Sequence, residues 1–397
     1  MKIAIANLVE INCKIGGTER ISSNLAIEFE RLGHTVFFVA QRKYKYSEPN
    51  YKPVVEQMML PNPLIADCEE NIIFLSSFLV EKKIDILKNQ CGRSVDFSNL
   101  CIAVKKRTNI KLLTVYHFDP AYEIKNYNTP LSLLRFRSWI MRQIYFYLKK
   151  TIQYKRLKKE CSDVYYRNYM ASDAVILLSN HFRPSFKTIA GLNDISKLKS
   201  IPNFPAFRVS EENIPKEKQI LWIGRICNSN KRPERLVQIW SYLEDKHPDW
   251  HVLFLGDGPS KQSVEHFVKR MGLKNVRFGG LIDPEEEYRK SSIICITSTH
   301  EGLPMVLLEG MQFGVVPLAF SSFESIEDII EEGITGYKIQ PFDLKQYAHR
   351  LESLMTDENK RRQMALNAQK HVAEKFDVQK ICKKWITLFE DVLSDKI

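Results

Sequence analysis

HVLFLG, residues 251–256, is a short apolar run that ends in glycine, and similar runs lie around it in the second half of the sequence. Each run has the length of one buried strand and is followed by a turn or by a helical pattern. The other runs are QILWIG (219–224), VRFGG (276–280), SIICITS (292–298) and VVPLAF (315–320). This alternation predicts a doubly wound parallel sheet, which binds ligands at the carboxyl ends of its strands.

The first half of the sequence begins in the same way. A predicted strand at 2–8 is followed by a glycine-containing loop and by a helix from Thr18 to about Gly33. Residues 201–217 contain three prolines and no helical period, which is typical of a linker. We therefore predict an α/β chain of two Rossmann-like doubly wound domains that face a central cleft. Further strands of the first domain are expected at 34–40, 111–117 and 173–179.

Charge is divided unevenly along the 397 residues. Residues 1–200 hold 31 Lys and Arg against 18 Asp and Glu, and the excess is greatest in 131–160, where aromatic residues are interleaved. This composition favours contact with an anionic membrane surface, and the alternative is a pair of core helices with a solvated basic face. No nucleic-acid-binding module accompanies the basic segment, so no nucleic-acid partner is expected.

Other classes of protein are excluded by simple features of the sequence. No apolar run reaches the roughly 18 residues that would span a bilayer. The eight cysteines are scattered without a CxxC pair, a pattern that indicates reduced thiols and no structural zinc. We expect a cytoplasmic protein, which would be peripheral at the inner face of the plasma membrane if residues 131–160 bind lipid and not if they form a core helix pair.

THEGLPMVLLEGMQFG, residues 299–314, is the strongest candidate site. Glu301 precedes a predicted helix that begins near Pro304, and Glu309 lies within that helix. Backbone amides at a helix start lack intrahelical acceptors and suit an anion or sugar hydroxyls, which here makes Gly302, Leu303, Pro304 and Met305 candidate binding residues. The alternative for the two glutamates is a loop charge and a solvated helix face.

Two basic residues follow the predicted strand 219–224, namely Arg225 and Lys231. Both would lie at the end of a strand, where they could neutralise a departing nucleoside diphosphate. The sequence contains no D-x-D pattern for a divalent metal, so we predict no metal and no cofactor. The alternative is that these are ordinary surface charges.

The first half contributes weaker candidates. Gly16 and Gly17 would let the backbone approach a ligand closely. His117 lies at the end of the predicted strand 111–117, although a histidine in such a place is more often structural.

Together these residues resemble the retaining family 4 glycosyltransferases of the GT-B fold. The family's E-x7-E element matches Glu301 and Glu309, its Gly-Arg and later Lys match Gly224, Arg225 and Lys231, and its Gly-Gly-Thr-Glu matches residues 16–19. The match weakens in the first half, where residues 82–92 replace the family's usual strand that ends in histidine.

The resemblance implies a role for each matched residue. Glu309 would contact the ribose and Glu301 the donor sugar, while the backbone at 302–305 would contact sugar and phosphate. His117 would lie near the donor's anomeric carbon. The segments that would flank the nucleotide base contain Gly256, Gly258 and Phe278.

The resemblance also implies a division of labour. Residues 1–202 would bind the acceptor, together with a final helix at 378–397 that crosses back, and residues 203–377 would bind a UDP-sugar, GDP-sugar or similar donor. The expected activity is retaining, metal-independent transfer of a hexose or N-acetylhexosamine to a saccharide or lipid-linked saccharide in cell-surface polysaccharide synthesis. The alternatives are a nucleotide-sugar epimerase of the same architecture and a non-catalytic sugar-nucleotide-binding protein.

Overall fold

The computed structural model describes residues 1–13, 16–44, 51–127, 143, 147–148, 152–205, 207 and 215–396. The chain separates into two compact units. The first comprises Met1–Pro202 with Cys382–Ile397, and the second comprises Asn203–Ile381.

The first unit contains a parallel sheet in which β1 is central. Among the described residues, seven strands follow the order β3-β2-β1-β4-β5-β6-β7, and every pair is parallel. The strands are β1 (Lys2–Val9), β2 (Thr35–Arg42), β3 (Gln57–Met59), β4 (Ile86–Asn89), β5 (Lys111–Tyr116), β6 (Ala174–Leu177) and β7 (Leu198–Ser200). The predicted strands of this unit are present, each shifted by two residues or fewer at either end.

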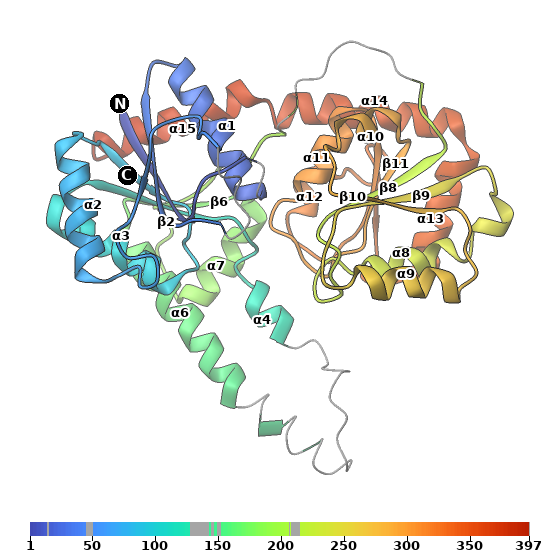
Figure 1. Ribbon diagram of the computed structural model, residues 1–397, viewed down its shortest axis with the longest axis horizontal. Coiled ribbons are helices and arrows are strands. Elements are labelled where there is room, and N and C mark those ends of the chain that lie inside the picture. Colours follow the sequence, from blue (N-terminus) through green and yellow to red (C-terminus); the bar gives the residue numbers. More distant parts are fainter. Residues whose placement is uncertain are drawn as a thin grey trace. The chain divides into compact units, whose positions relative to one another are not determined.

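Helices cover both faces of this sheet (Figure 1). They are α1 (Gly17–Arg31), α2 (Glu69–Glu81), α3 (Val95–Thr108), α4 (Tyr122–Tyr127), α6 (Tyr154–Ala171), α7 (Arg183–Ala190) and α15 (Val378–Leu393), with a 3-10 turn η2 (Asn180–Phe182) before α7. Helix α1 ends before Gly33, which has a φ of +83° that suits glycine.

Helix α15 returns the chain to the first unit. Ile381, Trp385, Phe389 and Val392 are all buried, as their spacing of one helical face predicts. The ring of Phe389 packs edge-on against Phe29 of α1, with 5.5 Å between the ring centroids. The aromatic face of α15 is therefore part of the core of the first unit.

The second unit has a parallel sheet of six strands among the described residues, in the order β10-β9-β8-β11-β12-β13. The strands are β8 (Gln219–Ile223), β9 (His251–Leu255), β10 (Val276–Gly280), β11 (Ile293–Ile296), β12 (Val316–Phe320) and β13 (Tyr337–Ile339). All five strands predicted from the apolar runs are present. Strand β13 is an additional edge strand of three residues, too short for an apolar run to reveal it.

Helices on the two faces of this sheet complete the second unit, with α8 and α9 on one side and α11 and α14 on the other (Figure 1). The helices are α8 (Pro233–Trp240), α9 (Lys261–Arg270), α10 (Glu285–Lys290), α11 (Met305–Gln312), α12 (Ile326–Ile329), α13 (Leu344–Thr356) and α14 (Glu358–Lys375), with a 3-10 turn η3 (Glu244–Lys246). The predicted fold class, two Rossmann-like α/β domains, is confirmed.

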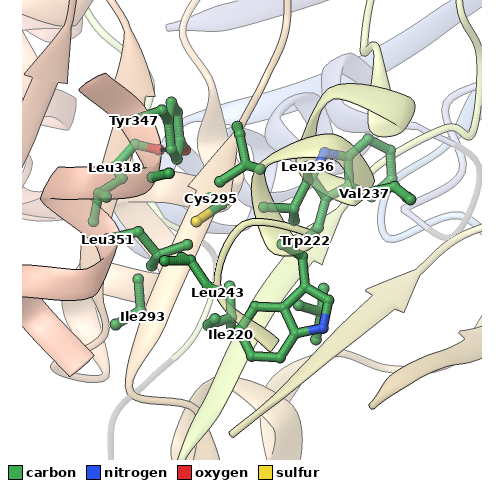
Figure 2. Packing of buried hydrophobic residues seen from close by; sticks show 14 of the residues in the cluster. Ile220, Trp222, Leu236, Val237, Leu243, Ile293, Cys295, Leu318, Tyr347 and Leu351 are labelled. Atoms are coloured by element: carbon green, nitrogen blue, oxygen red, sulfur yellow. Dashed lines mark hydrogen bonds between the residues drawn. The ribbon is translucent and has the colours of Figure 1, made fainter. Parts of the chain in front are cut away.

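Helices α8 and α13 pack on one face of the second sheet and form part of its hydrophobic core. Figure 2 shows Trp222 of β8 and Cys295 of β11 enclosed by Leu236 of α8 and Leu351 of α13, all of them buried. Packing on this face holds the strands in register, so the loops that leave β8 and β11 emerge side by side.

Candidate active site

Three sequence-predicted residues meet at the carboxyl end of the second sheet. The Lys231 ammonium donates a hydrogen bond of 2.7 Å to Oε1 of Glu301, and the two side chains are only 23% and 9% exposed. A Cβ atom placed on Gly224 would lie 3.6 Å from Cδ of Lys231, so the lysine stem passes over this glycine. The Lys231 ammonium, the Glu301 carboxylate and the backbone of Gly224, which has no side chain, are thus close together.

Thr297 holds the segment that carries Lys231, and sequence reasoning missed it. Its hydroxyl lies 3.1 Å from the carbonyl of Lys231 and 2.9 Å from that of Arg232, and it accepts a hydrogen bond from the indole N–H of Trp222. The backbone N–H of Thr299 also donates to the carbonyl of Asn230. A hydroxyl near the end of the predicted strand 292–298 was the available signal, because the carboxyl ends of strands face the ligand side of such a sheet.

Two glycine-containing loops, at 224–226 and 256–258, contact each other next to the Lys231–Glu301 pair. The N–H of Gly224 donates to the carbonyl of Leu255, and the N–H of Ile226 donates to that of Asp257. A Cβ atom on Gly256 would lie 2.0 Å from the carbonyl oxygen of Gly224. Glycine is therefore required for the loops to approach each other.

Gly258 and Arg225 belong to the same pair of loops. A Cβ on Gly258 would lie 2.4 Å from the carbonyl oxygen of Ile226, so a second close approach depends on glycine. Arg225 is exposed, and in the part of the chain that the structure describes no ion pair is recorded for it. Its guanidinium is thus available to an incoming anion.

The start of helix α11 lies next to Glu301. The helix begins at Met305 with Pro304 as its N-cap, so its first amides have no acceptor within the helix. Ser325 donates from its buried hydroxyl to the carbonyl of Gly302, which fixes the turn, and Leu303 is buried. Amides held in this way can bind an anion without reorganising.

Glu309 lies in the interior of the second unit. Its side chain is fully buried on α11, and the hydroxyl of Tyr288 on α10 donates a hydrogen bond of 2.8 Å to Oε2. Contact with a ribose would require this carboxylate to become accessible. Its role stays a prediction from the resemblance.

Loss of the Tyr288 hydroxyl is expected to destabilise the protein. In Tyr288→Phe the buried carboxyl group of Glu309 loses a hydrogen bond, which costs about 1–3 kcal/mol of unfolding free energy. Urea unfolding followed by circular dichroism measures the difference. Tyr242→Phe, at a tyrosine that is 49% exposed, is the matched control, and equal midpoints for the two variants would contradict the prediction.

Phe278 lies on the edge strand β10. Its ring stacks on Phe254 of β9, with the centroids 5.2 Å apart and the planes 14° from parallel. The side chain is partly buried against the core. The ring is half-buried, and its contact with a nucleotide base stays a prediction from the resemblance.

In the first unit, the paired glycines begin helix α1. Gly16 is the N-cap, and Gly17 is exposed as the first residue of the helix. Oε1 of Glu19 accepts a hydrogen bond of 3.1 Å from the side-chain amide of Asn7, at the end of β1. The glycines thus lie at the carboxyl end of the central strand, the edge at which parallel sheets bind ligands.

His117 follows β5 at the same edge. Its Nε2 lies 2.8 Å from Oε1 of Gln90, which follows β4. Its Nδ1 is buried, and within the described residues it has no hydrogen-bond partner. Burial, together with the smaller effect of the charge of nearby Lys88, lowers the pKa of His117 to about 3. The imidazole is therefore neutral at physiological pH.

Lys88 is a fully buried lysine on β4, and its ammonium lies 3.9 Å from the ring centroid of Trp385 on α15. Burial lowers the pKa of Lys88 from 10.5 to about 7. The indole face favours the charged form and so partly offsets the loss of solvation.

Lys88 is expected to make stability depend on pH. Because its pKa in the folded state is below its pKa in the unfolded state, the unfolded chain binds more protons between about pH 7 and pH 10.5, and stability rises with pH across this window. Below pH 7 the destabilisation is fully present. Lys88→Met should raise the urea midpoint most on the acidic side of pH 7 and flatten the profile.

The matched control for this prediction is Lys106→Met, which removes an exposed lysine of α3. This variant should keep the pH profile of the unsubstituted protein. Parallel profiles for Lys88→Met and the unsubstituted protein would show that Lys88 does not titrate as described.

Most of the basic segment 131–160 lies outside the described residues. Within it, helix α6 exposes Lys155, Arg156, Lys158 and Lys159, and Ile152 is 63% exposed just before the helix. No helix among the described residues is long and apolar enough to cross a membrane. The described residues also contain no group of three or more His, Cys, Asp and Glu placed to hold a metal ion.

Comparisons with known proteins show which proteins this chain resembles. The family model "Glycosyl transferases group 1" matches residues 203–371, the part that contains the Lys231–Glu301 pair. The chain is 28% identical over 183 residues to a Campylobacter jejuni α-1,4-N-acetyl-D-galactosaminyltransferase whose name specifies an undecaprenol-linked acceptor; the alignment covers 46% of this chain and half of that enzyme. It is 24% identical to an uncharacterized glycosyltransferase of Haemophilus influenzae, with 93% of this chain and 95% of that protein covered.

Solved structures give the same result for the fold. The structure of HepE from Anabaena in complex with UDP and glucose matches with a TM-score of 0.74 at 15% identity, and the match covers 98% of this chain and all of that one. Residues 203–371 belong to the glycosyl transferases group 1, and the chain has the GT-B fold. The sequence-based prediction of this class is confirmed, and the epimerase alternative is not favoured.

The glycosyltransferase thus carries its predicted residues in two groups. Gly224, Lys231, Glu301 and the start of α11 are close together in the second unit, with Gly256 and Gly258 in the adjoining loop. Gly16, Gly17 and His117 lie at the carboxyl edge of the first sheet. Gln90, with Ser22 behind it, contacts His117, and Thr297 holds the segment that carries Lys231; none of these three residues was predicted.

Proposed function

We propose that this glycosyltransferase transfers a hexose or N-acetylhexosamine from a UDP-sugar, with retention, to a saccharide or lipid-linked saccharide of a cell-surface polysaccharide. The observation that carries the proposal is the Lys231–Glu301 pair beside the start of α11. An ammonium and free amides can stabilise the charge that develops on a leaving diphosphate. Glu301 can accept hydrogen bonds from sugar hydroxyls.

The donor would bind to the second domain, 203–377, and the acceptor to the first domain, 1–202 with 378–397. The Lys231 ammonium donates a hydrogen bond to the Glu301 carboxylate. A bound donor would replace this bond with contacts of its own to both side chains. Arg225 would add a second positive charge at the diphosphate. This electrostatic neutralisation needs no metal, so we propose metal-independent transfer.

Support for the choice of donor and acceptor comes from the proteins that the chain resembles. HepE was solved with UDP and glucose, and the Campylobacter enzyme is named for an undecaprenol-linked acceptor. The order of strands also fits a nucleotide sugar such as a UDP-sugar. Lys231 follows β8, which lies between β11, before the sugar-binding Glu301, and the half-buried ring of Phe278 on β10.

A screen of nucleotide sugars by thermal shift tests the donor. A donor that binds only the folded protein raises the melting temperature, by an amount that grows with ligand concentration. We expect UDP-sugars to stabilise the protein more than GDP-sugars. Release of UDP only when an acceptor is present then separates transfer from epimerisation, and the absence of release under every condition would support a binding protein instead.

We further propose that the enzyme acts as a peripheral protein at the cytoplasmic face of the membrane, where a lipid-linked acceptor would be presented. The exposed lysines and arginine of α6 and the exposed Ile152 favour an anionic lipid surface. Sedimentation with vesicles of anionic lipid at low salt is the test. Recovery of the protein in the supernatant would exclude this contact.

A further inference from the structure

A chain of three side chains connects helix α1 to His117 inside the first unit. The Ser22 hydroxyl donates to the carbonyl of Thr18 at 2.8 Å, and the side-chain amide of Gln90 donates to Oγ of Ser22 at 2.8 Å. Nε2 of His117 lies 2.8 Å from Oε1 of Gln90. Ser22 and Gln90 are 0% and 4% exposed, so water does not compete for these contacts.

The direction of every hydrogen bond in this chain is set at one end. A backbone carbonyl has no proton, so Thr18 can only accept, and the Ser22 proton must point toward it. Oγ of Ser22 then has only lone pairs to offer to Gln90, which must present its NH2 group. The amide oxygen of Gln90 is thereby turned toward His117, whose Nε2 must carry the proton.

We propose that Gln90 is a positioning residue that, together with Ser22, holds His117 in the tautomer protonated at Nε2, so that Nδ1 can only accept a hydrogen bond from a sugar hydroxyl. The part about the sugar rests on the proposed function, whereas the tautomer does not. Nδ1 is the ring nitrogen without a partner among the described residues, and a buried acceptor in this state gains from any donor that reaches it.

The chemistry of the ligand follows from this arrangement. A neutral ring that offers a lone pair repels a phosphate oxygen, which is also an acceptor, and attracts a hydroxyl. Burial keeps the ring neutral by lowering the pKa of His117, and the charged form of nearby Lys88 acts in the same direction. His117 would therefore recognise a sugar hydroxyl and not a phosphate group.

Nuclear magnetic resonance of the full chain labelled with 15N-histidine tests the tautomer directly. The chain has nine histidines, and the signals of His117 are assigned from their loss in His117→Ala. Near neutral pH we expect a protonated Nε2 and an unprotonated Nδ1. A protonated Nδ1 in the unsubstituted protein would overturn the proposal, whatever the enzyme transfers.

Two variants test the chain of hydrogen bonds. Gln90→Leu removes the acceptor for Nε2, and Ser22→Ala leaves Gln90 in place but frees its amide to rotate. Both are expected to give a mixture of tautomers at His117 and to lower kcat/KM for transfer by about tenfold, the scale of one lost hydrogen bond. Ser22 hydrogen-bonds to Thr18 and Gln90 and reaches His117 only through Gln90, so an unchanged tautomer and rate in Ser22→Ala would refute the relay even if Gln90→Leu fails to fold.

The second unit offers a matched control. Nε2 of His251 lies 2.8 Å from Oε1 of Gln219, whose amide nitrogen donates to Ser291, at the opposite ends of strands β8 and β9 from the site. Gln219→Leu should change the signals of His251 and leave those of His117 and the transfer rate unchanged. If Gln219→Leu lowered the rate as much as Gln90→Leu, the positioning role would fail and a general loss of folding would explain both.

Discussion

Replacement of Lys231 by alanine is expected to lower the rate of sugar transfer by about 100- to 1000-fold, the loss seen when one preorganised donor to a developing negative charge is removed. Lys231 is 23% exposed and its ammonium forms an ion pair with Glu301, so the position of the ammonium is fixed before a donor binds. The measurement is turnover with a UDP-sugar and acceptor, together with the melting temperature of the same variant.

A second lysine of the same unit provides the control. Lys218 pairs with Asp249 at the start of β8, and both side chains are more than half exposed, so Lys218→Ala should cost less than about 1 kcal/mol of stability and leave turnover unchanged. Lys231→Ala should also lose some stability, because Glu301 keeps a largely buried charge. Intact turnover in Lys231→Ala, with a lower melting temperature, would reduce Lys231 to a structural role.

The second large effect is expected for Gly256→Ala. The new Cβ would lie 2.0 Å from the carbonyl oxygen of Gly224, and the φ of +127° at residue 256 strains any side chain. We expect a loss of on the order of 3–5 kcal/mol in the free energy of unfolding, together with loss of donor-induced thermal stabilisation. The loop at 224–226 cannot move away without breaking the bonds from Gly224 and Ile226 to the neighbouring loop.

The variant Gly272→Ala separates the effect of a steric clash from the effect of backbone strain. Gly272 has a φ of +72° after helix α9, and a Cβ there would meet nothing within 4 Å. This variant should lose about 1–2 kcal/mol from backbone strain alone and keep its response to the donor. If the two alanine variants unfolded at the same urea concentration, the contact between the two glycine loops would have no special importance.

The architecture was predictable from the sequence where the strands are buried on both faces. In the second half, strands such as 251–255 read as continuous apolar runs because helices cover both sides of the sheet. Strand β4 was not assigned, because Lys88 and Asn89 interrupt its apolar run. The reason is physical: Lys88 is tolerated there only through Trp385, which is almost three hundred residues away in sequence.

The candidate site was predictable to the extent that its residues follow strand ends. Lys231 and Glu301 are 70 residues apart, and their ion pair follows from parallel strands β8 and β11 being neighbours. The burial of Glu309 against Tyr288 was not predictable, because helical spacing gives the direction of a side chain and not what covers it. Gln90 was overlooked for a similar reason, since its importance depends on Ser22 and His117 in other elements.

Helix α15 also determines when the first unit can be completed. During synthesis the sheet of that unit is finished at Ser200, yet Trp385 and Phe389 are translated only after the 179 residues of the second unit. At a synthesis rate of about 5–20 residues per second, the apolar surface around Phe29 stays uncovered for some 10 to 35 s. The first unit begins the chain, yet it cannot bury this surface until almost the whole chain has been synthesised.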